Sequence, residues 1–199
     1  LPLIDPQTIP TVAVSINKNW AQVNSMFAAG FEKVLSQPLP KEYTEIVQKA
    51  QKEKDEFQKI NVVTSELARQ MTYAGDWKNS EDMFFPKNLK KISALKTGDC
   101  KDFATATAGI LRKMGIKASV ALVQRMLPLN PGYLMARQNF PNEEPIVNMQ
   151  TWNHAIVKVT LANQKDIWVD PTNPVSFAGY VKEDIKDSPA LVLSPDSKQ

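Results

Sequence analysis

The chain has one cysteine and one histidine among its 199 residues, so two of the side chains most used in protein chemistry are almost absent. A single cysteine excludes a disulfide bond within the chain. One cysteine and one histidine are also too few for the four nitrogen and sulfur ligands of a common structural zinc site. We therefore expect no metal and no cofactor. Any cysteine–histidine chemistry must use Cys100 and His154.

The chain also lacks a strong charge of one sign and a long apolar run. Its 24 basic and 21 acidic side chains leave a net charge of +3, which is too weak to indicate a nucleic-acid partner. No run of about 18 apolar residues is present, so we expect no insertion into a membrane. Residue 1 is Leu rather than Met, and we expect a processed chain or part of a longer polypeptide.

Hydrophobic residues make up 43% of the chain, enough for a core, and their spacing predicts helices in the first half. Three prolines in residues 1–12 predict an extended arm. Residues 15–33 are predicted to be helical, because large apolar side chains recur every three or four residues. The segment from Thr44 to about Met71 has no Pro or Gly. Its charged middle, 49–56, fits either one long helix or a break between two. Residues 76–96 are predicted to be irregular.

The second half predicts one more helix followed by strands. The helix covers residues 100–114 and ends at Gly115. A strand is predicted over 116–125, then a proline-rich surface loop over 128–145. Two further strands form a hairpin, with a turn at Asn163-Gln164: residues 153–160 and 166–170. This order predicts an α+β fold, with the helix packed on an antiparallel sheet and extra helices at the N-terminal side.

Cys100 stands at the start of its predicted helix. Asp99 is the expected N-cap and Asp102 the third helical residue, a variant of the capping box. A helix N-terminus offers unpaired N–H groups and about half a positive charge, which favours a thiolate over a thiol. A nucleophilic cysteine also needs a nearby imidazole and a third group that orients the ring.

His154 and Asp170 begin and end the predicted hairpin and are equidistant from residue 162. Antiparallel pairing would make their side chains neighbours on one face, shared with Ile156 and Lys158. We expect the Cys100 helix to pack against that face. Each residue alone has an ordinary structural explanation: a buried thiol, a structural histidine, a turn aspartate. Their joint placement favours a catalytic triad.

Three motifs carry a family resemblance. They are Gly98-Asp99-Cys100-Lys101-Asp102 with Leu111-Arg112-Lys113-Met114-Gly115-Ile116, Asn153-His154-Ala155-Ile156-Val157, and Trp168-Val169-Asp170-Pro171-Thr172. Over roughly residues 60–175 the chain resembles the bacterial transglutaminase-like superfamily. The resemblance implies a papain-like core in which Cys100 is the nucleophile, His154 the general base and then acid, and Asp170 the orienting group. It implies acyl transfer from an amide through a thioester, with a protein or peptide substrate.

The same resemblance divides the chain into an N-terminal arm and helix, 1–40, and a transglutaminase-like catalytic domain, 41–199. Val12-Ala13-Val14-Ser15 with Trp20 resembles the segment that joins such domains to a preceding β-rich module. We therefore expect flanking domains and a bacterial protein that is periplasmic or secreted.

An oxyanion hole is expected to combine the Cys100 backbone N–H with one other donor. Trp77, Gln70 and Asn79 are candidates, with packing or surface roles as the alternative. Candidates for walls of a substrate groove are Trp152, Asn153, Trp168 and Tyr73. Packing within the hairpin is the alternative for the tryptophans. The loop 128–145 is a candidate cap of the cleft.

Two functions of different class follow. The leading one is a cysteine-dependent peptidase or amidase, or a transglutaminase. Hydrolysis is favoured over cross-linking because water is always available. The other is a non-catalytic module of the same fold that binds a protein or peptide, since a fold does not fix a function. A domain that is inactive without its flanking modules is a third possibility.

Overall fold

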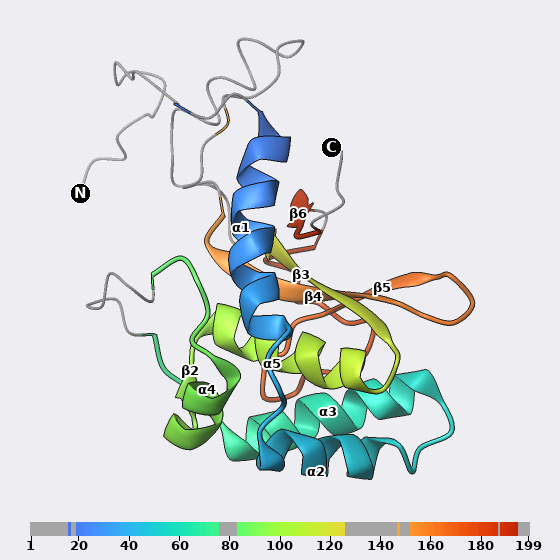
Figure 1. Ribbon diagram of the computed structural model, residues 1–199. Coiled ribbons are helices and arrows are strands. Elements are labelled where there is room, and N and C mark those ends of the chain that lie inside the picture. The colour runs from blue at the N-terminus through green and yellow to red at the C-terminus, as the bar shows by residue number, and fades with distance from the viewer. Residues whose placement is uncertain are drawn as a thin grey trace, which may run out of the picture.

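The computed structural model describes residues 16, 19–75, 83–125, 147, 152–186 and 188–194. The predicted arm 1–12 and loop 128–145 lie outside these residues. The described helices are α1 (Trp20–Leu35), α2 (Lys41–Ala50), α3 (Glu56–Gln70), α4 (Leu89–Leu95) and α5 (Cys100–Lys113). The described strands are β1 (Thr72–Tyr73), β2 (Thr97–Gly98), β3 (Lys117–Val123), β4 (His154–Thr160), β5 (Asp166–Val169) and β6 (Ala190–Val192). Figure 1 shows α5 in the centre, between the sheet and the pair α2 and α3. This arrangement confirms the α+β fold.

Side-chain caps set where the first helices begin. Asn19 caps α1 and accepts a hydrogen bond from the Gln22 N–H at 2.9 Å, so the described helix starts at Trp20. The helix is interrupted between α2 and α3, and Asp55 caps α3 by accepting a hydrogen bond from the Gln58 N–H at 3.1 Å. The alternative of two helices is therefore correct for residues 44–71. The first N–H groups of a new helix have no partner within it, and the Asp55 side chain supplies one of the missing acceptors.

The prediction that residues 76–96 are irregular was wrong at its C-terminal end, because α4 forms there. Asn88 caps α4 by accepting from the Lys91 N–H at 2.8 Å. Two residues of this helix, Leu89 and Ile92, are fully buried. The helix ends at Lys96, whose φ of +53° is left-handed. Only two of its apolar side chains are buried, and a helix of seven residues is marginal on its own, so tertiary packing decides this segment.

The main sheet has the order β5-β4-β3-β6, with every neighbouring pair antiparallel. The three strands expected after residue 115 are confirmed as β3, β4 and β5. The short parallel pair of β1 and β2 aligns Thr72 with Thr97 and Tyr73 with Gly98. This pairing places the segment after α3 directly beside the entry to α5. Strands of two or three residues leave no alternation in the sequence, which is why β1, β2 and β6 were not expected.

Helix α5 is the buried centre of the molecule. Every residue from Lys101 to Leu111 is buried. The helix shares its core cluster with Ala155, Val157 and Val159 of β4. Ile156 belongs to a separate cluster on the other face of the sheet. The expectation that the Cys100 helix packs on the face of Ile156 was therefore wrong, and the uninterrupted apolar set of β4 decides the packing.

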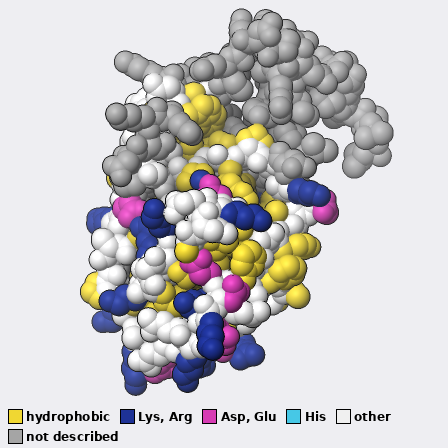
Figure 2. All heavy atoms as spheres, turned by 90° about the vertical axis from the view of Figure 1, so that its right-hand side faces the viewer, with side chains coloured by type: hydrophobic (Ala, Val, Ile, Leu, Met, Phe, Trp, Pro, Cys, Tyr) yellow, Lys and Arg dark blue, Asp and Glu magenta, His cyan; other side chains and the backbone are white. Residues whose placement is uncertain are grey.

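Among the described side chains on the face that Figure 2 presents, Lys and Arg are mixed with Asp and Glu. Hydrophobic side chains gather in the middle of that face, with Lys, Arg, Asp and Glu interspersed around them. Large exposed hydrophobic side chains among the described residues include Val175, Phe177 and Tyr180. Within the described ranges no helix has the length and apolarity to cross a membrane.

Candidate active site

Cys100 is the first residue of α5 and is half-buried with a free thiol. The capping box expected around it is present. The Asp99 carboxylate accepts from the Lys101 N–H at 3.2 Å, and the Asp102 carboxylate accepts from the Asp99 N–H at 3.2 Å. The sulfur therefore sits where the unpaired N–H groups and the positive end of the helix dipole favour negative charge.

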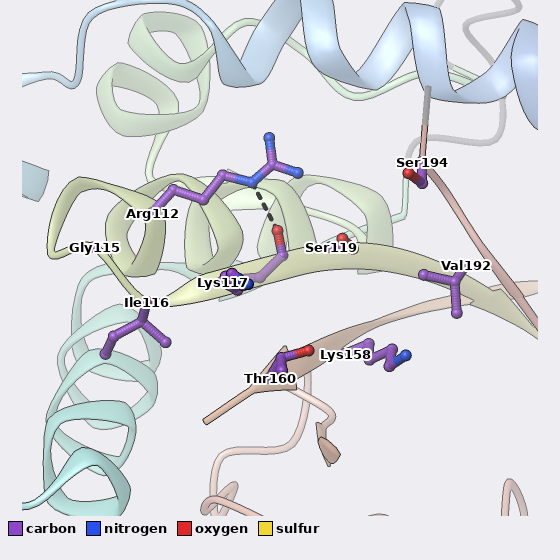
Figure 3. A pocket seen from close by; sticks show the side chains of 10 residues that line it. Arg112, Gly115, Ile116, Lys117, Ser119, Lys158, Thr160, Val192 and Ser194 are labelled. Carbon is purple, nitrogen blue, oxygen red and sulfur yellow. Dashed lines mark hydrogen bonds between the residues drawn. The ribbon is translucent and has the colours of Figure 1, made fainter. Parts of the chain in front are cut away.

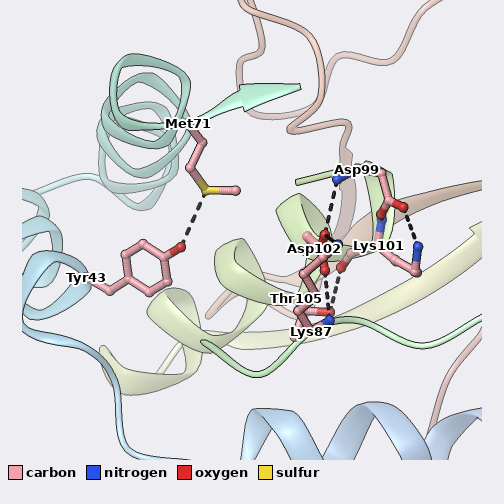
Figure 4. A network of polar contacts seen from close by, with 7 residues as sticks. All are labelled: Tyr43, Met71, Lys87, Asp99, Lys101, Asp102 and Thr105. Atoms are coloured by element: carbon pink, nitrogen blue, oxygen red, sulfur yellow. Dashed lines mark hydrogen bonds and ion pairs between the residues drawn. The ribbon is translucent and has the colours of Figure 1, made fainter. Parts of the chain in front are cut away.

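Two ion pairs fix this helix start (Figure 4). Asp102 is fully buried and accepts from both the backbone N–H and the Nζ of Lys87, at 2.9 and 3.0 Å. Lys101 Nζ pairs with the Asp99 carboxylate. A buried carboxylate with these partners is satisfied, whereas loss of one partner would leave an uncompensated charge in the core. The network thus holds the loop before α4 against the first turn of α5.

His154 and Asp170 meet at the end of the β4–β5 hairpin. His154 Nε2 lies 3.1 Å from Asp170 Oδ2, and both side chains are 3% exposed. Asp170 Oδ1 accepts from the backbone N–H and the hydroxyl of Thr172, at 3.1 and 2.7 Å. Both carboxylate oxygens are therefore used, one to hold the imidazole and one to fix the carboxylate itself.

The hairpin register differs by two residues from the predicted one. Val157 pairs with Val169, so Asp170 falls opposite Ile156 rather than His154. Side chains alternate with a period of two along a strand, and a shift of two residues keeps Asp170 on the same face as His154. The contact survives as a diagonal one.

The surroundings of His154 determine its protonation. Burial opposes the charged ring, but hydrogen bonds to Asp170 and to the Cys100 side chain, with the attraction of both groups, raise the pKa of His154 to about 9. Because Asp170 takes Nε2, the nitrogen left for Cys100 is Nδ1. Burial also opposes the charge of Asp170, yet the bonds from His154 and Thr172 keep the pKa of Asp170 below its usual value. The pair is an imidazolium–carboxylate at neutral pH.

The groove candidates lie in different settings. Asn153 clamps the end of β3: its amide accepts from the Arg125 N–H at 2.7 Å and donates to the Arg125 carbonyl at 3.0 Å. Trp168 is half-buried in the cluster on the sheet face away from α5. Trp152 meets Trp20 of α1 edge-on, with ring centroids 5.4 Å apart. Its buried indole N–H has no partner among the described residues.

The candidates for the second oxyanion donor are only partly visible. Trp77 and Asn79 lie outside the described residues. Gln70 is the half-buried last residue of α3. Tyr73, placed by β1 opposite Gly98, is 47% exposed, and its ring centroid is 6.2 Å from that of Phe103 in α5. Tyr73, which was predicted only as a wall of the substrate groove, thus has a ring that contacts the Cys100 helix.

Sequence reasoning did not single out Arg125 or Thr172. Arg125 donates from Nε to Asp184 Oδ2 at 2.7 Å. That bond is the main reason its pKa is raised, and the electrostatic influence of Asp170 and Tyr73 adds to the effect. A cation thus lies within electrostatic reach of the site. Nothing in the sequence around Arg125 marked it, whereas Thr172 stands in the Asp-Pro-Thr motif and is the typical partner of an Asx turn.

The described residues also contain an open cavity of about 560 Å³ away from these side chains (Figure 3). It lies between the end of α5 and strands β3 and β4. Two of its charged side chains already have partners: Arg112 binds Glu32 and the Ala118 carbonyl, and Lys158 binds Asp166. None of the groups around Cys100 lines it. In the described part of the chain no cluster of His, Cys, Asp or Glu could hold a metal ion.

Comparison with known proteins places this geometry in a family. The model of the transglutaminase-like superfamily matches residues 44–171, which include Cys100, His154 and Asp170. No curated protein matches the chain.

One similar solved structure supports the fold, and two more are similar to a lesser degree. A proposed protease from Parabacteroides distasonis ATCC 8503 superposes with a TM-score of 0.51 at 16% identity. The match covers 73% of this chain and 26% of that one, so this chain spans about a quarter of its length. A TGase has a TM-score of 0.43 at 15% identity, covering 87% and 37% of the two chains. A proposed cysteine protease from Cytophaga hutchinsonii has a TM-score of 0.42 at 18% identity, covering 77% and 47%.

Proposed function

Because the chain belongs to the transglutaminase-like superfamily, we propose that it is a cysteine acyl-transfer enzyme that acts on amide bonds of peptides or proteins. One observation carries the proposal: His154 lies between Asp170 and the thiol at the start of α5. The helix start favours a charged sulfur, the imidazole can accept and return a proton, and the carboxylate holds the ring.

In the first half-reaction the proton of Cys100 already resides on His154, and Cys100 Sγ attacks the carbonyl carbon of the substrate with its free electron pair. A new C–S bond forms as the C=O bond becomes a C–O⁻ oxyanion. The oxyanion then collapses, the C–N bond breaks, and His154 returns the proton to the leaving amine. The products of this half-reaction are a thioester on Cys100 and a free amine.

In the second half-reaction the thioester carbon is attacked by water or by an amine, whose proton passes to His154. The C–S bond breaks, the sulfur leaves with its electron pair, and His154 keeps the proton, which restores the starting pair of charged groups. Hydrolysis gives a carboxylic acid, and transamidation gives a new amide. We favour hydrolysis, because water needs no binding site. The imidazolium form of His154 at neutral pH supports its role as the acid that releases the amine.

The proposal is tested by labelling with iodoacetamide. At pH 7 the single thiol of the parent chain should be alkylated at least tenfold faster than that of the His154→Gln variant, since the ring no longer favours the thiolate. The Cys100→Ala variant should take no label and keep the parent's circular dichroism spectrum. Equal alkylation of parent and His154→Gln would contradict the enzyme and favour a binding module.

A peptide mixture then separates hydrolysis from transamidation. The parent chain is incubated with casein peptides in the presence and absence of a primary amine, and the products are identified by mass spectrometry. We expect new C-terminal carboxylates whether or not the amine is added. Incorporation of the amine without cleavage would assign transamidation. No product from the parent that is absent with Cys100→Ala would refute catalysis on peptides by this chain.

A further inference from the structure

Tyr73 lies near Cys100 but belongs to β1, an element that carries none of the three residues of the triad. The parallel pairing of β1 and β2 aligns Tyr73 with Gly98, and the next residue, Ala74, donates its N–H to the Gly98 carbonyl at 2.9 Å. The ring faces Phe103 of α5. The backbone beside Tyr73 is thus held at Gly98 and the ring of Tyr73 at Phe103, and Cys100 lies between these two residues in the sequence.

The Tyr73 hydroxyl lies within hydrogen-bonding reach of the Cys100 backbone. That contact favours the phenolate form, so the backbone N–H is the donor and the phenol oxygen the acceptor. The same N–H is the donor that an oxyanion on an acyl group attached to Cys100 would need. The phenol oxygen therefore marks the place where the negative oxygen of the intermediate would form.

We propose that Tyr73 is a further catalytic residue: its hydroxyl yields the Cys100 N–H to the acyl oxygen and donates a hydrogen bond to that oxygen as the second oxyanion donor. This inference rests on the proposed function. The side chain is 47% exposed, so the hydroxyl can shift sideways without leaving a packed core. The shift it needs is the separation of two hydrogen-bonded oxygens, about 2.7 Å.

The protonation state of the phenol suits this role. Burial, followed by the electrostatic influence of Cys100 and Asp99, raises the pKa of Tyr73 to about 12. The hydroxyl therefore keeps its proton at neutral pH and can donate a hydrogen bond. No proton moves from Tyr73 to the oxyanion, because the intermediate collapses with its negative charge intact. The step balances with the transfers already assigned to His154.

The test compares two reagents that attack the same sulfur. With p-nitrophenyl acetate, Cys100 Sγ forms a C–S bond, an oxyanion develops, and p-nitrophenolate leaves with the electron pair of the broken C–O bond. With iodoacetamide, the sulfur displaces iodide from a saturated carbon and no oxyanion develops. Only the first reaction needs an oxyanion donor.

We expect Tyr73→Phe to slow acylation of Cys100 by p-nitrophenyl acetate roughly 10- to 100-fold, below the full effect known for amide substrates because the ester is activated. Alkylation by iodoacetamide should change less than twofold. Tyr73→Phe keeps the ring against Phe103. Tyr180→Phe is the matched control, since it removes the hydroxyl of an exposed tyrosine stacked on Phe177 and should alter neither rate.

Three results would overturn the inference while leaving the proposed function intact. Unchanged acylation would mean that another residue is the second oxyanion donor, and Trp77 would be the next candidate to test. Faster acylation would make Tyr73 a cover of the N–H and nothing more. Equal slowing with both reagents would mean that Tyr73 acts on the thiol. If the parent reacts with both reagents no faster than His154→Gln does, the proposed function fails, and the inference falls with it.

Discussion

The two halves of the candidate site are built in different ways. The Cys100 half is held by contacts close in sequence: the capping box of Asp99 and Asp102 spans four residues, and Lys87 joins it from 15 residues away. The His154–Asp170 half depends on the register of a hairpin whose strands are separated by a turn. The first half is set by local helix chemistry, and the second by alignment over a distance. Stability should therefore respond most to the first half, and reactivity most to the second.

The largest effect is expected from Asp102→Ala, which leaves Lys87 and the Asp99 N–H without their buried partner. Breaking one side of a buried pair costs about 3–5 kcal/mol in the free energy of unfolding. Asp166→Ala is the matched control, because Asp166 pairs with Lys158 at 44% exposure and should cost less than about 1 kcal/mol. Urea unfolding measures both. Equal losses would show that the helix start is no more dependent on its ion pair than the surface is.

The next effect is a pH dependence of stability from the hairpin half. The pKa of His154 is raised from 6.5 to about 9, so its contribution is complete below pH 6.5 and is lost as the pH rises through 9. The shift corresponds to about 3 kcal/mol at most. The pKa of Asp170 is lowered, so its contribution is present above its ordinary value of 3.8 and is lost at more acidic pH.

We therefore expect the parent to lose stability between pH 6.5 and pH 9.5 relative to His154→Gln, in urea unfolding at both values. The two proteins would differ by the same amount at both pH values if the ring were neutral in the folded state. That result would show that His154 is not protonated in the folded protein at these pH values.

Asp170→Asn should slow the reaction of Cys100 with p-nitrophenyl acetate roughly 10- to 100-fold. The amide can still orient the ring, as asparagine does in papain-like enzymes, but it cannot stabilise the imidazolium. The ring's pKa should fall with it, which NMR titration of the single histidine can follow. A ring that titrates unchanged in this variant would separate Asp170 from His154.

The smallest effect is expected from Thr172→Val, which removes the hydroxyl bond to Asp170 Oδ1 and keeps the backbone bond. Acylation should slow about three- to tenfold, equivalent to about 1 kcal/mol for one hydrogen bond to a charged group. Thr160→Val, which removes a bond to exposed Asp166 at the other end of the hairpin, is the control. A larger loss at residue 160 would argue against a site at the hairpin end.

The contrast also explains what sequence alone could predict. The start of α5 was fully predictable, because Asp99, Cys100 and Asp102 interact within one helical turn. The proximity of His154 and Asp170 was predictable although the register was off by two, since the period of a strand tolerates an even shift. The side of the sheet that α5 covers was predicted wrongly: the uninterrupted apolar residues of β4 lie on one face, but Ile156 gives the other face an apolar residue as well. Tyr73 was named only as a groove candidate, because its link to Cys100 depends on a strand of two residues.

The most direct test of the central claim is a double-mutant cycle on the rate at which p-nitrophenyl acetate acylates Cys100. The cycle compares the parent, His154→Gln, Asp170→Ala and the variant carrying both substitutions. If Asp170 acts through His154, the double variant should be as slow as His154→Gln alone, because groups that work as a unit are not additive. A double variant slowed by the product of the two single losses would contradict the account.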